Sequence, residues 1–474
     1  MSFNTTGLLA PQIPHAQRLI DSLYLNGAAY DGSDTGIGKT YVAACIAKSM
    51  NARLVAICPK LVMPAWKKIL AQFGVKASLV INFEKLCRGN TPYLKYGKCK
   101  KVDRWKNAIV KLPAGSFVIV DEAHRGKGPF SLNAGLIIAL KRQGYRSLCL
   151  SATAATTATE MKAFGYMLNL HDGGLAEDRY YKTCDFNQFC IDHGAEWTGR
   201  YGAMTTNLDS PKVKAAMKEL HLHLTEQQQI MSRLTREEMG SLFPENQVVA
   251  SAYDLGEGSK KIAALYDWME DEIAKLNEAV ADYSGCILAV ITKARRQIEL
   301  LKVPAMLEMT EDLYDEGKSV VLFVNFTDTI ELLTRRLRGM EKFAQTVGCI
   351  YGRVSEKNRL ADIDAFNADR KRIIVANIAA GGQSISLHDL NGKHPRASII
   401  NPNYSAYQVL QALGRIHRQG GLTKCYQRFL FAAGTREEMA CRRVQSRLNN
   451  LSILNDGDLV DGMRFFRFCA GKSI

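Results

Sequence analysis

Residues 33–40 read Ser-Asp-Thr-Gly-Ile-Gly-Lys-Thr, and a helix-favouring run, residues 41–50, follows them. In such a turn, backbone N–H groups around the glycines and the positive end of the helix face a polyphosphate. Lys39 would neutralise the β- and γ-phosphate oxygens, and the Thr40 hydroxyl would bind Mg²⁺. Ser33 stands where a strict loop of this kind has glycine, and it keeps a small side chain. The predicted nucleotide-binding residues of this segment are Ser33, Thr35, Gly36, Ile37, Gly38, Lys39 and Thr40.

Two carboxylates follow an apolar run that reads Phe-Val-Ile-Val over residues 117–120. Ligands of open α/β sheets bind at the carboxyl ends of strands, so Asp121 should meet the phosphates near Lys39 and complete the Mg²⁺ shell. Glu122 is then free to orient an attacking water, and His124 would relay the state of the nucleotide. Together the two segments predict hydrolysis of ATP, with ATP and Mg²⁺ as the bound cofactors.

The 474 residues exceed what one hydrophobic core usually supports, so we expect two or three domains. Short apolar runs rich in Val, Ile and Leu alternate with helix-like stretches in two separate regions. These runs occupy residues 54–58, 78–81, 116–120 and 147–150, and then 319–324, 348–351, 372–377 and 397–401. The sequence therefore predicts an α/β protein with two lobes, each built on a parallel sheet flanked by helices.

The composition between these regions suggests how the lobes are divided. We expect the first lobe, which binds ATP, to span residues 1–170, followed by a helical or irregular insertion over residues 171–240. Residues 241–317 contain a stretch rich in Lys, Glu, Leu and Ala, and they should form a helical linker and the start of the second lobe. That lobe would continue over residues 318–474.

The formal net charge of +15 arises from 62 Lys and Arg against 47 Asp and Glu, and such a surplus favours a polyanionic partner. Nucleic acid is the first candidate. In the predicted insertion, Trp197, Arg200 and Tyr201 could stack on bases or separate strands, although aromatic residues grouped in this way more often pack a subdomain.

The 12 cysteines are sparse for this length and none forms a CxxC pair, which suits a reducing compartment. Cys184, Cys190 and His193 lack an obvious fourth ligand, so we do not expect zinc there. Residues 1–10 lack the charged and then apolar pattern of a leader, and no apolar run reaches the length of a membrane span. We therefore expect a protein of the cytoplasm, in a bacterium or in a virus-infected host cell.

With the phosphate loop and the acid pair in place, the chain resembles the superfamily 2 helicases, and the match continues in order along nearly the whole sequence. The resemblance implies two RecA-like lobes and a nucleic-acid partner. Ser151-Ala152-Thr153 resembles the third motif of the family, which couples the ATP site to the nucleic-acid site. Gln17 resembles the glutamine that reads adenine ahead of the phosphate loop.

Two segments of the second lobe resemble the fifth and sixth motifs of the family. Residues 379–387 read Ala-Ala-Gly-Gly-Gln-Ser-Ile-Ser-Leu, and residues 411–418 read Gln-Ala-Leu-Gly-Arg-Ile-His-Arg. The resemblance adds Gly382 to the nucleotide-binding residues and Gln411 to the catalytic residues.

The sixth motif carries two arginines, Arg415 and Arg418, three positions apart. At this spacing both should lie on one face of a helix, from which their planar guanidinium groups can reach the γ-phosphate. They would act as an arginine finger that stabilises transition-state charge only when the lobes close, so that hydrolysis is coupled to lobe movement.

In this family the nucleic-acid strand crosses both lobes, and loops at strand ends contact it largely through its phosphates. The matching positions are Pro59, Lys60, Asn82 and Thr153 in the first lobe and Asn325, Thr327, Arg353, Ala380 and Gly381 in the second. Such contacts position a strand without reading its sequence, so we expect little sequence preference and strong salt dependence.

Several segments indicate a branch of the family. Those that look like the Swi/Snf-type double-strand DNA translocases are residues 56–66, 81–86, 232–236 and 414–418. Residues 382–421 are also similar to helicases of phages and large DNA viruses. That branch usually has proline and asparagine after the third motif, where this chain has Ala154 and Thr157, and no chromatin-reading domain is appended. Nucleosome remodelling is therefore not expected.

The sequence thus predicts an ATP-dependent helicase or translocase that moves along DNA and could unwind or remodel branched DNA. Two alternatives stay open. An RNA helicase shares the same catalytic elements, because the residues that read a 2′-hydroxyl are not visible in one sequence. A nucleic-acid clamp would use ATP without directional movement.

Overall fold

The computed structural model describes residues 5–88, 91–97, 107–153, 155–172, 185–198, 203–278, 284–381, 385–403, 405–439, 442, 454 and 468–473. The chain forms two compact units. The first consists of Met1–Gly240 and Ser446–Met463, and the second of Ser241–Gln445 and Arg464–Ile474. Within the described part of the chain, no helix has both the length and the apolar character that a membrane crossing requires.

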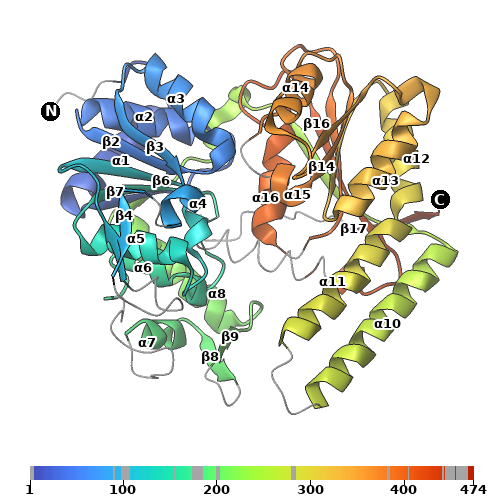
Figure 1. Ribbon diagram of the computed structural model, residues 1–474, viewed down its shortest axis with the longest axis horizontal. Coiled ribbons are helices and arrows are strands. Elements are labelled where there is room, and N and C mark those ends of the chain that lie inside the picture. Colours follow the sequence, from blue (N-terminus) through green and yellow to red (C-terminus); the bar gives the residue numbers. More distant parts are fainter. Residues whose placement is uncertain are drawn as a thin grey trace. The chain divides into compact units, whose positions relative to one another are not determined.

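A parallel sheet forms the centre of the first unit, in the order β10-β1-β7-β6-β2-β3 among the described residues. Its strands are β1 (Ala28–Asp31), β2 (Arg53–Cys58), β3 (Ala77–Asn82), β6 (Ser116–Asp121), β7 (Arg146–Leu150) and β10 (Met231–Ser232). The helices around it are α1 (Gln12–Leu25), α2 (Lys39–Ser49), α3 (Met63–Gln72), α4 (Phe83–Cys87), α5 (Leu132–Arg142) and α6 (Lys162–Met167) (Figure 1).

Both faces of this sheet are buried, which explains why its strands are continuous apolar runs. Phe117 and Ile119 of β6 pack in one core with residues of α1, α2 and α3. Val118 and Val120 point to the opposite face and pack in a second core with residues of α5 and α6. Because all the strands are parallel, their carboxyl ends lie at one edge of the sheet.

Residues 185–240 contribute to this unit instead of forming a separate body. They contain α7 (Asp185–Asp192), the antiparallel pair β8 (Ala195–Thr198) and β9 (Ala203–Thr206), α8 (Pro211–Leu222), β10 and α9 (Arg236–Met239). Phe186 and Phe189 of α7 enter the core beside α5 and α6, and β10 pairs with β1. Trp197 pairs with Met204 between β8 and β9, whereas Arg200 and Tyr201 lie outside the described residues. A second small antiparallel pair joins β4 (Leu94–Tyr96) to β5 (Ala108–Val110).

The second unit is also built on a parallel sheet, in the order β13-β14-β12-β15-β16-β11-β17 among the described residues. Its strands are β11 (Asn246–Asp254), β12 (Ser319–Val324), β13 (Val347–Ile350), β14 (Ile373–Asn377), β15 (Arg396–Ile400), β16 (Cys425–Ala432) and β17 (Phe468–Ser473). Its helices are α10 (Glu257–Glu278), α11 (Ser284–Leu301), α12 (Val303–Asp315), α13 (Thr327–Arg338), α14 (Glu356–Asn367), α15 (Ile378–Gly381) and α16 (Ala406–Ile416). The fold is the predicted pair of α/β lobes with parallel sheets.

Helices occupy most of residues 257–315, where the sequence predicts a helical linker. They are α10, α11 and α12, and all three belong to the second unit, whose sheet the chain has already joined through β11. Figure 1 shows α10 and α11 side by side as a helical hairpin. α11 also carries Glu299, a fully buried carboxylate beside the carboxyl end of β12.

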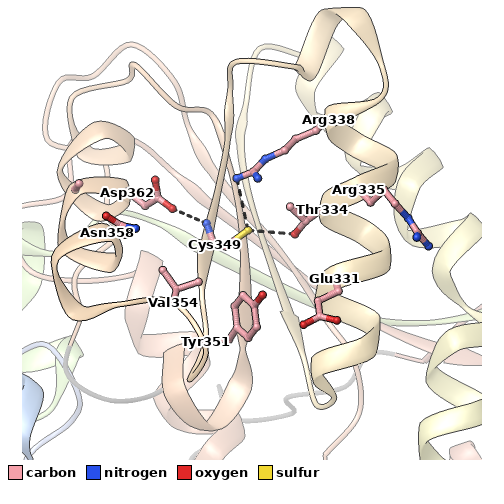
Figure 2. Close-up of a pocket in the computed structure, with 10 residues that line it drawn as sticks. Glu331, Thr334, Arg335, Arg338, Cys349, Tyr351, Val354, Asn358 and Asp362 are labelled. Carbon is pink, nitrogen blue, oxygen red and sulfur yellow. Dashed lines mark hydrogen bonds between the residues drawn. The ribbon is translucent and has the colours of Figure 1, made fainter.

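Strand β13 is an edge of the second sheet, and a pocket of about 510 Å³ lies beside it between α13 and α14 (Figure 2). Asp362 of α14 accepts a hydrogen bond of 2.8 Å from the backbone N–H of Cys349, and Lys371 neutralises that carboxylate. Arg338 of α13 donates to the carbonyl of Val347 over 3.3 Å. Side chains thus occupy two of the polar backbone groups of β13.

Candidate functional site

The predicted phosphate loop connects β1 to α2. Gly36 and Gly38 adopt φ values of 88° and 94°, a conformation that costs glycine little and strains a residue with a side chain. Helix α2 begins at Lys39, so its unpaired N–H groups are at the loop. The sequence folds locally as predicted: a strand, a glycine-rich turn and the amino terminus of a helix.

The side chain of Lys39 forms hydrogen bonds with its own loop. Its Nζ donates to the carbonyls of Ser33 and Asp34 over 2.7 and 2.8 Å. Burial lowers the pKa of Lys39, while the carboxylates of Asp31, Glu122, Asp34 and Asp121 oppose that shift. The ammonium group therefore lies among carboxylates and loop carbonyls, and a bound phosphate would have to replace the two carbonyls as its acceptor.

The acid pair lies at the carboxyl end of β6. Asp121 Oδ2 accepts a hydrogen bond of 2.8 Å from Trp66 Nε1. Burial raises the pKa of Asp121 to about 7, and the charge of Glu122 adds to the rise, whereas Trp66 and Lys39 oppose it. A cation that binds this carboxyl group would have to displace a proton under mildly acidic conditions.

Thr40 and Asp121 are the predicted Mg²⁺ ligands, and both offer oxygen atoms. Among the described residues, no group of three or more His, Cys, Asp or Glu side chains could hold a metal ion. Mg²⁺ sites at nucleotides commonly need only one or two protein carboxylates, because phosphates and water supply the other ligands. The oxygen atoms of Thr40 and Asp121 thus fit a Mg²⁺ ion that phosphates and water also coordinate.

Glu122 adopts the left-handed backbone conformation, with φ of 57° and ψ of 49°. This conformation costs a residue with a side chain about 1–2 kcal/mol, and such strain is often found at functional sites. Its Oε2 is 3.4 Å from Nδ1 of His124. Burial, followed by Lys127 and Arg125, holds the pKa of His124 well below its usual range, so the imidazole is neutral.

The predicted coupling residues, His124, Ser151 and Thr153, contact one another next to the acid pair. Nδ1 of His124 lies 3.1 Å from Oγ of Ser151, and that hydroxyl accepts a hydrogen bond from the backbone N–H of Thr153. The phenol of Tyr30 donates to the carbonyl of Ser151 over 2.8 Å. Thr153 is only 1% exposed. Its side chain is therefore not exposed for the predicted nucleic-acid contact, and its predicted coupling role stays a prediction.

Two arginines that the sequence reading assigned no role contact the phosphate loop. Arg233 donates to the carbonyl of Gly32 over 2.6 Å and to the carboxylate of Asp34 over 2.9 Å. Arg236 donates from its side chain to Oγ1 of Thr35 over 2.7 Å and from its backbone to Asp34 over 3.2 Å. Burial alone would raise the pKa of Asp34, but Arg233, Arg236 and Lys39 hold it below its usual value.

Helix α1 presents Gln12, not Gln17, to the phosphate loop. Gln12 is buried and donates to the carbonyl of Ile37 over 2.7 Å. Gln17 bonds with Asp21 of the same helix, so the structure does not bring the predicted adenine-reading residue to the loop. His15 contacts the loop through Nε2, which lies 3.3 Å from Oγ of Ser33, and its Nδ1 lies 2.8 Å from Oγ of Ser232.

The expectation that Arg415 and Arg418 share a helix face is wrong. Helix α16 ends at Ile416, and His417 is extended, with φ of −104° and ψ of 98°. His417 leaves the helix because its Nε2 bonds with the carbonyl of Pro244 over 2.8 Å. Arg418 therefore lies beyond the helix.

The two arginines nevertheless converge on one backbone group. Arg415 is 4% exposed, contacts Gln411 and donates to the carbonyl of Ile385 over 3.1 Å. Arg418 is partly exposed and donates to the same carbonyl over 3.0 Å and to Oγ of Ser386 over 2.7 Å. The predicted Gly382 lies outside the described residues. Arg418 is thus the more exposed of the pair.

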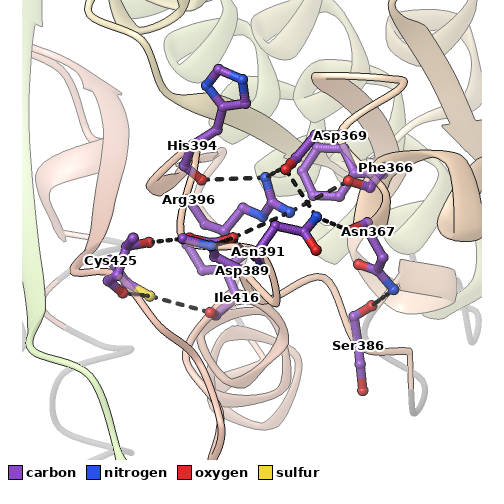
Figure 3. Close-up of polar contacts among 12 residues, drawn as sticks. Phe366, Asn367, Asp369, Ser386, Asp389, Asn391, His394, Arg396, Ile416 and Cys425 are labelled. Atoms are coloured by element: carbon purple, nitrogen blue, oxygen red, sulfur yellow. Dashed lines mark hydrogen bonds and ion pairs between the residues drawn. The ribbon is translucent and has the colours of Figure 1, made fainter.

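A polar network holds the segment that receives these arginines (Figure 3). Asn367 donates to the carbonyl of Ser386 over 3.1 Å, and Asn391 donates to the carbonyl of Asn367 over 2.8 Å. Asn391 also donates to Asp369, whose other oxygen accepts from the fully buried Arg396 over 2.8 Å. The end of α14 and strand β15 therefore fix the position of Ser386.

The predicted nucleic-acid residues lie at or after the carboxyl ends of strands. Pro59 and Lys60 follow β2, Asn82 ends β3, Asn325 and Thr327 follow β12, Arg353 follows β13, and Ala380 and Gly381 form part of α15 after β14. Several side chains are engaged within the protein. Asn82 donates to Glu84 over 2.8 Å, Arg353 to Glu331 over 2.8 Å, and Asn325 to Glu299 over 2.7 Å.

Known helicases are similar to this chain in sequence and structure. Residues 302–420 match the family described as the helicase conserved C-terminal domain. A putative ATP-dependent RNA helicase of Acanthamoeba polyphaga mimivirus is 32% identical over 484 residues, which cover 97% of this chain and 86% of that protein. This relative confirms the expected similarity to helicases of large DNA viruses. The solved Sulfolobus solfataricus SWI2/SNF2 ATPase core in complex with dsDNA aligns with 96% of this chain and 94% of its own, at 17% identity and a TM-score of 0.35.

Proposed function

This chain belongs to the superfamily 2 helicases, ATP-dependent enzymes that act on nucleic acid, and we propose that it uses ATP hydrolysis to move along DNA. The observation that carries the ATPase assignment is the group formed by Lys39, Asp121 and Glu122 at the carboxyl edge of the first sheet. The choice of DNA rests on the segments that look like Swi/Snf-type translocases. One of them, residues 232–236, contacts the phosphate loop.

In this mechanism the phosphate loop cradles the triphosphate through its N–H groups, and Lys39 exchanges the carbonyls of Ser33 and Asp34 for phosphate oxygens. Thr40 and Asp121 would hold Mg²⁺, which neutralises charge on the phosphates when bound. Glu122 orients the attacking water, and neutral His124 connects it to Ser151.

The second unit contributes Arg418 to hydrolysis. We assign its guanidinium group the stabilisation of charge that develops on the γ-phosphate. For this role, Arg418 must release the carbonyl of Ile385 and the hydroxyl of Ser386. Arg415 holds the same segment from a buried position and supports it.

An RNA helicase is the second candidate, because the mimivirus relative carries that description. The strand-end loops suit either substrate, since phosphate contacts do not distinguish DNA from RNA. A clamp that uses ATP without moving would share the same ATP site and would differ only in lacking directional movement.

Steady-state ATPase rates decide between these candidates. They should be measured without nucleic acid and with single-stranded, duplex and forked DNA and RNA at one low salt concentration, with Glu122→Gln as the inactive control. Strongest stimulation by duplex or forked DNA supports the proposal, whereas strongest stimulation by RNA replaces it with the RNA helicase. Displacement of a DNA-bound obstacle should accompany turnover, and a clamp would leave the obstacle in place.

A further inference from the structure

Residues 230–236 run alongside the phosphate loop and its preceding strand. The N–H of Tyr30 donates to the carbonyl of Ile230 over 2.8 Å, and the N–H of Gly32 to the carbonyl of Ser232 over 3.0 Å. The pairing continues into the loop, where Asp34 N–H donates to the carbonyl of Leu234 over 3.2 Å. The backbone of this segment is thus bonded to the phosphate loop as a short sheet extension.

Asp34 is held on two sides. Its carbonyl accepts from Lys39, and its carboxylate accepts from Arg233 and from the backbone of Arg236. The Arg233–Asp34 pair is mostly buried, with 8% and 17% of the side chains exposed, so solvent screens it less than a surface pair. Arg236 fixes Thr35 through its side-chain hydroxyl. A displacement of either arginine would therefore change the shape of the loop around Lys39.

The segment ends in helix α9, which leads to the boundary of the first unit. Helix α9 is closed by a reciprocal cap, in which Thr235 accepts from the backbone of Glu238 and Glu238 accepts from the backbone of Thr235. Gly240 then adopts φ of 56° and ψ of −132°, which residues with side chains rarely adopt. It is the last residue of this stretch of the first unit, and Ser241 begins the second.

We propose that residues 232–240 transmit movement of the second unit to the phosphate loop, with Gly240 as the pivot and Arg233 and Arg236 as positioning residues. The two arginines hold Asp34 and Thr35, and through Asp34 they set the position of the carbonyl that Lys39 must release. Nucleic acid that binds the second unit would then change the ATP site through this connection. That last step rests on the proposed function.

Two variants test the two ends of the connection. Arg236→Ala removes the bond to Thr35, and Gly240→Ala strains the pivot without a collision, since no atom lies within 4 Å of the added carbon. Glu237→Ala is the matched control, because Glu237 is the exposed neighbour of Arg236 on the same short helix. Arg236→Lys keeps the positive charge but loses the planar guanidinium group, so it should retain only part of the wild-type response to DNA.

The first readout is the ratio of kcat with saturating DNA to kcat without it. We expect Arg236→Ala and Gly240→Ala to reduce this ratio about tenfold, as expected for about 1.4 kcal/mol. Glu237→Ala should keep the wild-type ratio. If the variants slow both rates equally and leave the ratio unchanged, the segment only supports the fold and the inference is overturned.

The second readout needs no nucleic acid. Binding of a non-hydrolysable ATP analogue should change hydrogen exchange across residues 230–254 in the wild type, and Arg236→Ala should remove the change in residues 241–254. An unchanged wild-type pattern beyond Gly240 overturns the inference. If no nucleic acid stimulates the wild type, the proposed function fails, and this exchange response still decides whether the connection exists.

Discussion

Asn325 donates its side-chain amide to Glu299 over 2.7 Å, and its backbone N–H donates to the same carboxylate. Glu299 is fully buried in α11 and also accepts from the backbone of Phe326 and the amide of Asn401. The helical hairpin thus fixes the loop after β12 from inside the unit. The side chain of Asn325, a predicted nucleic-acid contact, is engaged within the protein.

Replacement of Glu299 should destabilise the second unit. Glu299→Ala leaves several buried N–H groups without an acceptor, and we expect the free energy of unfolding to fall by about 3 kcal/mol. Urea unfolding measures the loss, with Glu308→Ala, an exposed glutamate of α12, as the control. A loss below about 1 kcal/mol would show that water satisfies these groups and that the carboxylate is dispensable.

Arg415 and Arg418 should behave differently when replaced. We expect Arg418→Ala to lower kcat by about 10³-fold while ATP still binds, because this partly exposed arginine is assigned to the transition state. Arg415→Ala should instead lower the melting temperature, because it empties a buried site beside Gln411. Single-turnover hydrolysis and thermal unfolding distinguish the two, with exposed Arg336→Ala as the control. Full turnover in Arg418→Ala would refute the arginine-finger assignment.

Asp121 should make the stability of the nucleotide-free protein depend on pH. The pKa of Asp121 is about 7 in the folded state, whereas its ordinary value is 3.8. At a pH between these two values, the carboxyl group keeps its proton in the folded state and has lost it in the unfolded state. Its contribution to stability is therefore lost as pH rises from about 4 to about 7. Asp121→Asn should remove this pH-dependent contribution, while the side-chain oxygen of the asparagine can still accept the hydrogen bond from Trp66. Urea unfolding at pH 5 and pH 7.5 without Mg²⁺ measures it, and identical pH slopes in both proteins would contradict the shift.

Gln12 should matter more for nucleotide binding than Gln17. Gln12→Ala removes a buried bond to Ile37 in the phosphate loop, and we expect KM for ATP to rise about tenfold. Gln17→Ala should change neither KM nor the preference for ATP over GTP by more than about twofold, since Gln17 bonds only with Asp21 among the contacts described. Loss of that preference in the Gln17 variant would restore the role that the resemblance gave it.

Local patterns predicted the backbone of the candidate ATP site, because the elements that form it are close in sequence. The phosphate loop needs only a strand, two glycines and a helix, all within residues 28–49. The acid pair follows its strand directly, and the carboxyl edge of a parallel sheet brings both segments together.

Contacts between distant segments were not predictable in the same way. Strand β10 has two residues, too few for a strand pattern, yet it brings Arg233 and Arg236 beside a loop about 200 residues earlier in the chain. Helix α16 ends where His417 contacts the carbonyl of Pro244, a residue distant in sequence. The glycine that would indicate the end of a helix in the sequence, Gly420, comes later. The hydrogen bond between Gln12 and Ile37 likewise depends on how α1 packs. The sequence alone does not show which of Gln12 and Gln17 faces the phosphate loop.

The covering of β13 has a consequence for how copies of this protein meet. An open sheet edge is a template on which a second chain can add a strand, and such additions lead to aggregation. Here Asp362 and Arg338 occupy the groups at Cys349 and Val347 that an incoming strand would use. A copy that approaches this edge would first have to displace a neutralised carboxylate and a guanidinium group. Association of two copies by addition of a strand at this edge is therefore disfavoured.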